Sequence, residues 1–270
     1  MLTPDESEKA SIGVIGGTGV YDPALLSDSK EIKVYTPYGP TSDMITVGDY
    51  AGRRVAFLPR HGRNHSIPPH SINYRANIWA FKKLGVEYLI SPTAVGSLAE
   101  ELRPGDLVIA DQLIDRTSGR PSTFFEGYEV AHISLADPMC HQLRKLIIES
   151  CRKNGIPHHE RGTYVCIEGP RFSTRAESRM FRAWGADIVG MTLFPEASLA
   201  REAQMCFANI SMVTDYDSWK EGEAVSNAQV IETMKGNTQK LRKVLQDVIP
   251  RIPQVERKCE CATALKNALM

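Results

Sequence analysis

The chain has 270 residues, an apolar fraction of 42%, and 32 basic against 32 acidic residues, for a formal net charge of +0. A chain of this length can bury its own core, so we expect one domain over residues 1–270. The balanced charge argues against nucleic acid or a membrane surface as a partner. No apolar stretch approaches a membrane span and the first residues lack a signal-peptide pattern, so we expect a cytoplasmic protein.

The first third of the chain predicts short strands separated by turns. An apolar strand over residues 11–15 runs into the glycine-rich residues 16–19, which form either a plain tight turn or a loop whose backbone N–H groups and Thr18 hydroxyl bind a phosphate. A meander over residues 32–58 then leads to Arg60 and His61. Because the planar guanidinium of arginine matches a phosphate, we interpret this segment first as an anion or ligand contact.

The histidines of this segment could also be read as metal ligands. His61 and His65 would need a helix to share a face, and Gly62 with the prolines at 68 and 69 makes a helix improbable. Ordinary loop histidines remain the second interpretation, and metal ligands the third.

Helices and strands then alternate along the rest of the chain. We predict the helices from the helical spacing of apolar residues, from stop signals and from a capping box at Thr174 and Glu177. We predict the strands from short apolar runs. The expected helices cover residues 73–84, 139–153, 174–184, 196–205 and 227–249, and the expected strands cover residues 88–97, 107–111, 162–167, 188–192 and 206–213. After the strand expected at 107–111, we expect a polar loop through residues 116–128. This alternation predicts an α/β fold with a mixed central β-sheet flanked by helices.

Two acids flank an aromatic residue directly after the strand at 206–213, in the sequence Asp215-Tyr216-Asp217. Open α/β sheets bind their ligands at the carboxyl ends of strands, which favours a functional interpretation. Taken alone, the segment fits a solvated turn better, because aspartate is a common turn residue. The basic segment at Arg60 and His61 changes this balance: acids in one loop and bases in another suggest an anion bound beside a polar ring.

The cysteines divide into two groups. Cys140, Cys151, Cys166 and Cys206 lie in apolar or helical surroundings, where a free thiol behaves as a small buried hydrophobe. Cys259-Glu260-Cys261 lies in the C-terminal tail, residues 250–270. Zinc sites need a second ligand pair, which this tail lacks, so we expect no metal there. The pair is either two free thiols or a very short disulfide.

Five ordered motifs, spread over nearly the whole chain, closely resemble those of the methylthioadenosine phosphorylases, in the trimeric class of purine nucleoside phosphorylases. They are Gly16-Gly17-Thr18-Gly19, Arg60-His61-Gly62-Arg63, Thr93-Ala94-Val95-Gly96-Ser97, Glu168-Gly169-Pro170-Arg171-Phe172-Ser173 and Asp215-Tyr216-Asp217. The resemblance implies a fold of the nucleoside phosphorylase type. It also implies cleavage of methylthioadenosine by inorganic phosphate into adenine and 5-methylthioribose 1-phosphate, in methionine and purine salvage, by homotrimers or homohexamers.

The resemblance also implies roles for individual residues. The phosphate would be held by Thr18, Arg60, His61, Thr93, Ala94 and Thr192. The base and ribose would lie beside Phe172, Ser173 and Met191, the purine edge beside Asp215, Tyr216 and Asp217, and the alkylthio group near His65, Val230 and Ile231. Specificity would depend on Ser173 and on Asn227, which stands where animal members present an apolar residue.

The chemistry of glycosidic cleavage agrees with this reading. The sugar becomes cationic as electrons enter the purine, so an anion is needed on one face and a proton donor at the base. Phosphate supplies the anion, and Asp215, with its pKa raised by burial, would protonate N7; no metal or organic cofactor is needed. The alternatives are a purine nucleoside phosphorylase of broader or 6-oxo purine specificity, which would be expected to carry asparagine at 215, and a non-catalytic nucleotide-binding module.

Overall fold

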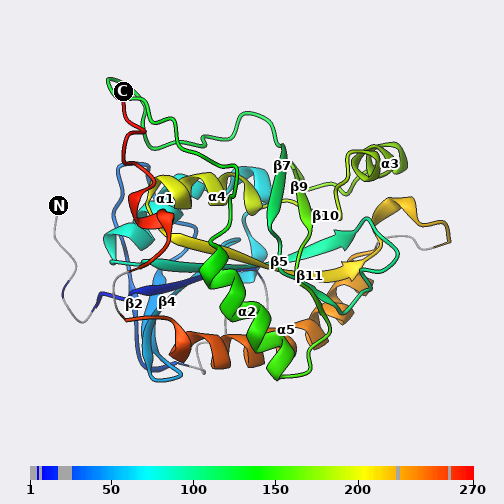
Figure 1. The fold of residues 1–270 in the computed structure, drawn as a ribbon, viewed down its shortest axis with the longest axis horizontal. Coiled ribbons are helices and arrows are strands. Elements are labelled where there is room, and N and C mark those ends of the chain that lie inside the picture. Colours follow the sequence, from blue (N-terminus) through cyan, green and yellow to red (C-terminus); the bar gives the residue numbers. More distant parts are fainter. Residues whose placement is uncertain (1–4, 6–7, 18–25, 223–225, 255–256) are drawn as a thin grey trace.

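A computed structural model of the chain describes residues 5, 8–17, 26–222, 226–254 and 257–270. Its centre is a mixed sheet with the strand order β2-β3-β4-β1-β5-β10-β9-β7, in which β11 also pairs with β5, β6 pairs with β11, and β8 pairs with β6 (Figure 1). The strands are β1 (Ile12–Gly16), β2 (Ser27–Ile32), β3 (Ile45–Tyr50), β4 (Arg53–Pro59), β5 (Tyr88–Ser97), β6 (Leu107–Val108), β7 (Gln112–Arg116), β8 (His158–His159), β9 (Thr163–Ile167), β10 (Ile188–Gly190) and β11 (Cys206–Asp215). The α/β fold with a mixed sheet is therefore confirmed.

Four parallel strands place their carboxyl ends at one edge. β1 pairs in parallel with β4 and with β5, and β11 pairs in parallel with β5 over almost its full length. β10 runs antiparallel to the end of β5, with Ile188 opposite Ser97 and Val189 opposite Gly96. The segments that follow β5 and β11 therefore lie together at this edge, whereas β4 ends level with the middle of β5 and β10 runs back from the edge towards it.

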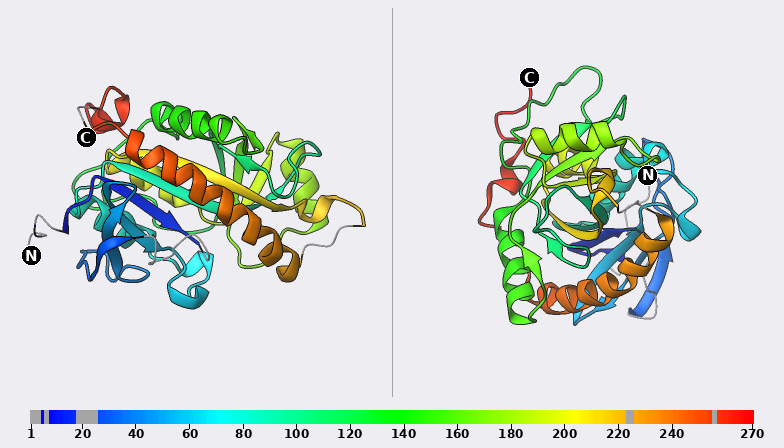
Figure 2. Two further views of the ribbon diagram at one scale, coloured as in Figure 1. Left: turned by 90° about the horizontal axis from the view of Figure 1, so that it is seen from below. Right: turned by 90° about the vertical axis from the view of Figure 1, so that its right-hand side faces the viewer.

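The helices cover both faces of the sheet. They are α1 (Tyr74–Lys83), α2 (His141–Lys153), α3 (Arg175–Ala183), α4 (Leu193–Glu202) and α5 (Asn227–Arg251). α1 packs with α4 on one face, whereas α2 packs with α5 on the other (Figures 1 and 2). Each face has its own apolar core: Ile78 and Leu199 belong to the first, Leu143 and Val244 to the second.

The helix boundaries follow local signals. Asn73 caps α1 by accepting from Ala76 N–H, and Thr174 with Glu177 forms the expected capping box of α3. The expected helix at 196–205 begins earlier, at Leu193, and ends at Glu202. α5 continues through Pro250 to Arg251, because a proline in the last turn removes few helical hydrogen bonds.

Two sequence expectations between residues 107 and 116 were wrong. The strand expected at 107–111 is only the two-residue β6, and β7 occupies residues assigned to no element. β7 reads Gln-Leu-Ile-Asp-Arg and lies at the end of the sheet path, paired with β9. An edge strand with polar exposed ends lacks the apolar run that identifies central strands.

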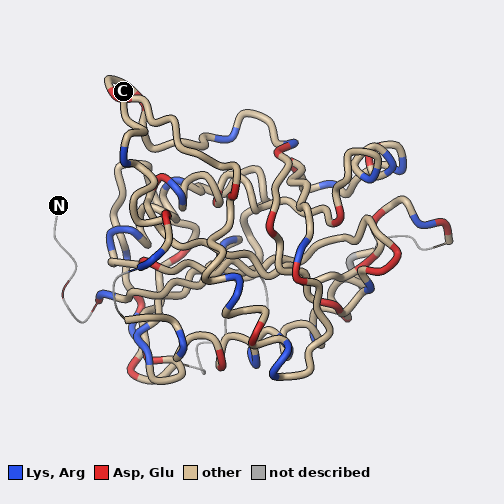
Figure 3. The backbone as a smooth tube through the Cα atoms, in the orientation of Figure 1, with Lys and Arg blue, Asp and Glu red and all other residues tan. Residues whose placement is uncertain are grey.

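Charges of both signs are distributed over the fold (Figure 3). Among the described residues, no helix combines the length and apolar character needed to cross a membrane.

Candidate active site

Asp215 and Asp217 are buried together where β11 ends. Asp215 is 5% exposed and Asp217 is 3% exposed. One oxygen of Asp215 accepts from the Thr214 hydroxyl at 2.7 Å, and the other accepts from Asp217 N–H at 2.8 Å. Burial raises the pKa of both carboxyls. The solvated-turn interpretation of this segment is therefore wrong, because both acids lie inside the protein.

Two serine hydroxyls lie beside the Asp217 carboxyl and partly offset the effect of burial on its pKa. Asp217 Oδ2, Ser173 Oγ and Ser178 Oγ are all buried, and none makes a well-aligned hydrogen bond within the described residues. Ser173 also lies against the acid loop through its carbonyl, which accepts from the Ser218 hydroxyl at 2.7 Å. Buried polar groups in native proteins nearly always have partners, so a polar ligand edge is the expected partner here.

Gly96 allows the acids to approach β5. A Cβ atom at position 96 would lie 3.0 Å from Asp215 Oδ1 and 3.1 Å from Asp217 Cβ. The loop is also fixed to β5 by Trp219, whose indole N–H donates to the Ser97 carbonyl at 2.8 Å. The acids are thus held at a defined distance from the strand that carries Thr93.

Arg60 follows β4 and is 1% exposed. Its guanidinium donates to both carboxylate oxygens of Glu196, to the Ile15 carbonyl at 2.8 Å and to the Ser91 hydroxyl at 2.7 Å, and one N–H of Nη1 donates to the Pro92 carbonyl at 3.2 Å. Most of its N–H groups are therefore engaged by the protein. Its phosphate contact stays a prediction, and any such contact would use the remaining Nη1 donor or follow a change in the Glu196 pairing.

His61 is buried against the carbonyl of Ile67. Its Nδ1 lies 2.9 Å from that oxygen, so Nδ1 carries the proton and Nε2 remains for another partner. Burial, reinforced by the charge of Arg60, lowers the pKa of His61 to about 4. The ring of His65 stacks on that of His61 with centroids 4.2 Å apart, and burial also lowers the pKa of His65. Both residues thus lie together, as neutral rings at neutral pH.

Thr93 lies in the core of the β5–β11 contact. Its Oγ1 accepts from Asn209 Nδ2 at 3.0 Å and lies 3.5 Å from the Ser211 hydroxyl, which itself donates to Asn209 Oδ1. Thr192 is 5% exposed and precedes α4 without making a side-chain cap. The antiparallel pairing of β10 with β5 ends with Val189 opposite Gly96, and Met191 and Thr192 follow directly after β10.

The remaining predicted residues lie closer to the surface. Phe172 is 41% exposed and Ile231 is 62% exposed, while Val230 is half-buried near the start of α5. The Tyr216 hydroxyl donates to the Glu100 carbonyl at 3.4 Å, and Lys220 lies over its ring. Thr18 lies outside the described residues, as does the side chain of Asn227. The individual roles of all these residues stay predictions.

Sequence reasoning missed three buried polar residues that organise this edge. Glu196 is fully buried in α4 and pairs with Arg60. Asn209 bridges Ser91 and Thr93 from inside β11. Arg120 donates to the carbonyls of Glu168, Met191 and Phe194. The only available signal was a polar residue within an apolar run, as for Glu196 and Asn209.

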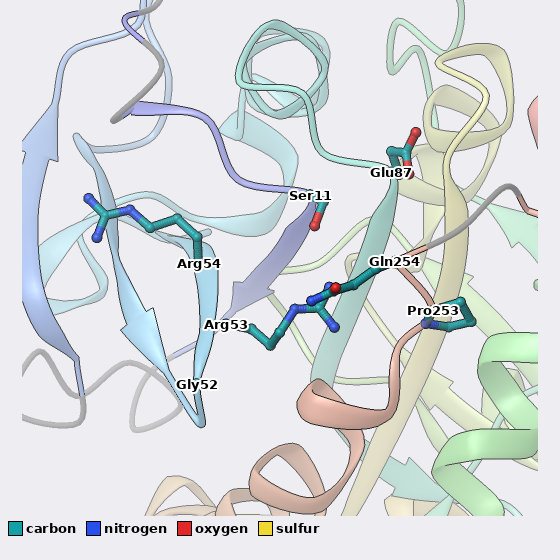
Figure 4. A pocket seen from close by; sticks show the side chains of 7 residues that line it. All are labelled: Ser11, Gly52, Arg53, Arg54, Glu87, Pro253 and Gln254. Atoms are coloured by element: carbon teal, nitrogen blue, oxygen red, sulfur yellow. The ribbon is translucent and has the colours of Figure 1, made fainter.

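Another hollow lies at the opposite end of the sheet. It is formed at the amino ends of β1 and β5 and at the β3–β4 turn (Figure 4), and its lining residues are Ser11, Gly52, Arg53, Arg54, Glu87, Pro253 and Gln254. It contains none of the predicted site residues.

The six cysteines are free thiols, so the disulfide left open at Cys259 and Cys261 is not formed in this structure. Four of them gather in one place, well separated in sequence. We call this group the four-cysteine cluster; its members are Cys140, Cys206, Cys259 and Cys261. Among the described residues, its side chains are the ones placed closely enough to hold a metal ion. The tail itself has no second ligand pair, but the fold brings Cys140 and Cys206 next to it.

A family model described as the phosphorylase superfamily matches residues 11–250, so the chain is a member of that superfamily. S-methyl-5'-thioadenosine phosphorylase of Thermofilum pendens is 60% identical over 97% of this chain and 100% of its own length. The enzyme of the same name from Saccharolobus solfataricus is 57% identical over 98% of this chain and 99% of its own length. Within the superfamily, the chain belongs to the S-methyl-5'-thioadenosine phosphorylase family.

Solved structures agree with this assignment. A methylthioadenosine phosphorylase from an antarctic soil metagenomic library aligns with a TM-score of 0.92 at 45% identity, covering 97% of this chain and 93% of that chain. An adenosine/methylthioadenosine phosphorylase variant of Schistosoma mansoni, solved with methylthioadenosine, aligns with a TM-score of 0.89 at 38% identity, covering 96% of each chain.

Proposed function

We propose that the chain catalyses phosphorolysis of S-methyl-5'-thioadenosine to adenine and 5-methylthioribose 1-phosphate. The observation that carries the proposal is the buried Asp215–Asp217 pair at the carboxyl end of β11, where Asp217 Oδ2 makes no well-aligned hydrogen bond among the described residues and the Ser173 and Ser178 hydroxyls lie beside the carboxyl. A carboxylate in this state accepts well from an exocyclic amine, and adenine offers one. Family membership and relatives of the same name at up to 60% identity support the reaction.

The reaction assigns distinct tasks to the two ends of the site. A phosphate oxygen attacks C1' of the ribose while the bond from C1' to the purine breaks and its electrons enter the base. Asp215, whose pKa burial raises, donates its proton to N7 of the leaving purine. Thr93 and Thr192 offer hydroxyl donors to the phosphate. No metal or organic cofactor takes part in this scheme, and inorganic phosphate is the co-substrate.

The neutral state of His61 matters for the anion. Its Nδ1 donates to the Ile67 carbonyl, so Nε2 of the neutral ring can accept the proton of a monohydrogen phosphate, whereas Nε2 of a protonated ring would donate to the dianion. Either arrangement gives one hydrogen bond to phosphate. Burial lowers the pKa of His61, whereas the negative charge of bound phosphate would raise it. We therefore expect the protonated, donating form of the ring to become more populated when phosphate binds.

Release of free adenine tests the function. The protein is mixed with methylthioadenosine with and without inorganic phosphate, and with inosine in parallel. We expect rapid, strictly phosphate-dependent release of adenine and slow release of hypoxanthine. Base release without phosphate would indicate a hydrolase, absence of release a binding module, and preference for inosine a 6-oxo purine phosphorylase.

We also propose that the chain forms homotrimers or pairs of trimers and acts in the cytoplasm. Phe172 and Ile231, assigned to the base and the alkylthio group, are 41% and 62% exposed in the single chain, which supports a neighbouring subunit closing the site. The free thiols fit a reducing compartment. Light scattering on a size-exclusion column measures the assembly, and a monomer in active solutions would refute it.

A further inference from the structure

The ring and the hydroxyl of Tyr164 are fully buried. Tyr164 lies in β9, is 0% exposed and belongs to the apolar core that includes Ile78 and Leu199. Its Oη makes no well-aligned hydrogen bond within the described residues. Phenylalanine would fill the same space without burying a hydroxyl, and buried polar groups in native proteins nearly always have partners. The oxygen therefore points to a role that an apolar ring could not serve.

Gly190, the last residue of β10, leaves room for this hydroxyl. β9 and β10 pair in parallel, with Tyr164 opposite Ile188 and Cys166 opposite Gly190. The tyrosine side chain reaches forward along β10, because a Cβ atom at position 190 would lie 1.9 Å from Oη. Thr192 follows two residues later, directly before α4. The pairing of the two strands thus carries the hydroxyl to the end of β10.

The neighbours of this hydroxyl are residues that are assigned to phosphate. Burial raises the pKa of Tyr164, and the Thr93 hydroxyl and the Thr192 backbone beside Oη partly offset this effect. The positive charge of Arg60 acts on the same oxygen. Groups from three separate parts of the chain therefore converge on one phenol, which keeps its proton at neutral pH and can donate it in a hydrogen bond.

The hydrogen bonds of Thr93 indicate where that proton goes. A threonine hydroxyl can accept two hydrogen bonds and donate one. Asn209 Nδ2 donates to Thr93 Oγ1 at 3.0 Å, while the Ser211 hydroxyl, 3.5 Å from Oγ1, donates to Asn209 Oδ1. One lone pair of Oγ1 thus remains for the phenol. With both lone pairs occupied, Thr93 acts as a donor, and the only acceptor beside it other than the distant Ser211 oxygen is the phosphate of the proposed reaction.

We propose that Tyr164 is a positioning residue of the phosphate site: its hydroxyl donates to Thr93 Oγ1 and thereby directs the Thr93 proton at the bound phosphate. This role deepens the proposed function and rests on it, because Thr93 is assigned to phosphate there. Tyr164 acts through Thr93 and not on the anion itself, since its side chain has no exposed surface. Without the phenol, the Thr93 proton is shared between phosphate and Ser211, and the anion loses a preorganised donor.

Tyr164→Phe tests the proposal, because it removes one oxygen and keeps the ring. The Kd of inorganic phosphate, measured by calorimetry in a buffer free of other oxyanions, should rise about 3- to 10-fold, the usual effect of losing one hydrogen bond. The KM for methylthioadenosine at saturating phosphate should change by less than about twofold. Tyr88→Phe is the matched control, because Tyr88 is a buried tyrosine at the first position of β5. It should leave both quantities unchanged.

A double-mutant cycle separates positioning from a general structural role. Thr93→Val removes the hydroxyl through which Tyr164 acts, so Tyr164→Phe should weaken phosphate binding no further in that background. Losses that add in the double variant would overturn the proposal. So would a Tyr164→Phe protein that melts at a lower temperature but binds phosphate normally, or a wild type that binds no phosphate. Binding is measured without nucleoside, so a wild type that binds phosphate but releases no adenine would refute the proposed function alone.

Discussion

The guanidinium of Arg60 and the carboxylate of Glu196 form a two-point ion pair in the middle of the protein, with side chains 1% and 0% exposed. Ser91 completes the arrangement by donating to Glu196 Oε2 at 2.8 Å while accepting from Arg60 Nη2. Each charge is desolvated, so removing either partner leaves the other uncompensated. The pair therefore links the stability of the sheet to the segment that carries His61.

Replacing Arg60 by alanine should have two separable effects. Glu196 would be left buried and unpaired, so we expect a loss of about 3–5 kcal/mol in the free energy of unfolding. If Arg60 also contacts phosphate, the KM for phosphate should rise far more than the KM for the nucleoside. Denaturant titration measures the first effect, and initial rates with each substrate varied in turn measure the second.

The double variant Arg60→Met, Glu196→Leu separates the two roles, because an apolar pair of similar volume replaces the buried charges. Its stability should recover most of the loss. A persistently raised phosphate KM in this variant would assign Arg60 to the phosphate site. A normal phosphate KM would mean that Arg60 acts only through the ion pair.

His61 should make the protein less stable in mild acid. Its folded pKa of about 4 lies below the ordinary 6.5 because of burial and the charge of Arg60. Below pH 6.5 the unfolded chain takes up a proton that the folded chain refuses, so stability falls as the pH drops from 7 towards 4. A shift of this size corresponds to about 3 kcal/mol at the acid end.

His61→Asn provides the comparison. An asparagine amide can still donate to the Ile67 carbonyl but does not titrate, and His65 is present in both proteins. The free energy of unfolding, followed by urea titration from pH 7 to pH 4, should fall less in the variant than in the wild type. Parallel curves would show that His61 takes up its proton as readily in the folded protein as in the unfolded chain.

Gly96→Ala should impair the site without unfolding the sheet. The added Cβ would lie 3.0 Å from Asp215 Oδ1 and 3.2 Å from a methyl of Val189, so the acid loop must shift by a few tenths of an ångström. Because catalysis depends on such positions, we expect kcat/KM to fall on the order of 100-fold. Gly236→Ala is the control: position 236 lies in α5 with open space around it, and alanine there should be neutral or stabilising. Equal activity of both variants would contradict the predicted role of the acid loop.

The sequence predicted those parts of the fold that depend on local signals. The capping box at Thr174, the apolar spacing of α1 and the apolar run of β11 each depend on neighbours within a few residues, and each is present in the structure. β7 escaped prediction because an edge strand is partly solvated and has a mixed pattern. Its place is set by pairing with β9, some fifty positions later in the chain.

In the candidate site, too, locally signalled features could be predicted, whereas contacts between distant residues could not. Motif order could predict that Asp215 and Arg60 belong to one edge of the sheet, because strand ends are readable. Nothing local indicates that Glu196 neutralises Arg60 from α4, or that Cys140 and Cys206 reach the tail cysteines. These contacts join residues far apart in sequence, and they form only when several elements pack together.

Asp215→Asn should change which purine the protein accepts. A 6-amino purine offers a donor at position 6 and an acceptor at N7, whereas a 6-oxo purine offers acceptors at both positions. Buried carboxylates opposed to a carbonyl oxygen cost several kcal/mol, or roughly a thousandfold in specificity. The asparagine amide supplies a donor but no acid, so we expect kcat/KM for methylthioadenosine to fall at least on the order of 100-fold. The preference over inosine should narrow or reverse.

The decisive quantity is the ratio of kcat/KM for the two nucleosides at saturating phosphate, in wild type and variant. Asp111→Asn is the matched control, because Asp111 accepts from the Gly162 N–H just before β9 and an asparagine oxygen can do the same. Its ratio should equal that of the wild type. Burial raises the pKa of Asp215, so the wild-type rate should also decline on the alkaline side as this acid loses its proton, and Asp215→Asn should lack that decline. An unchanged ratio in Asp215→Asn would mean that this side chain does not contact the base.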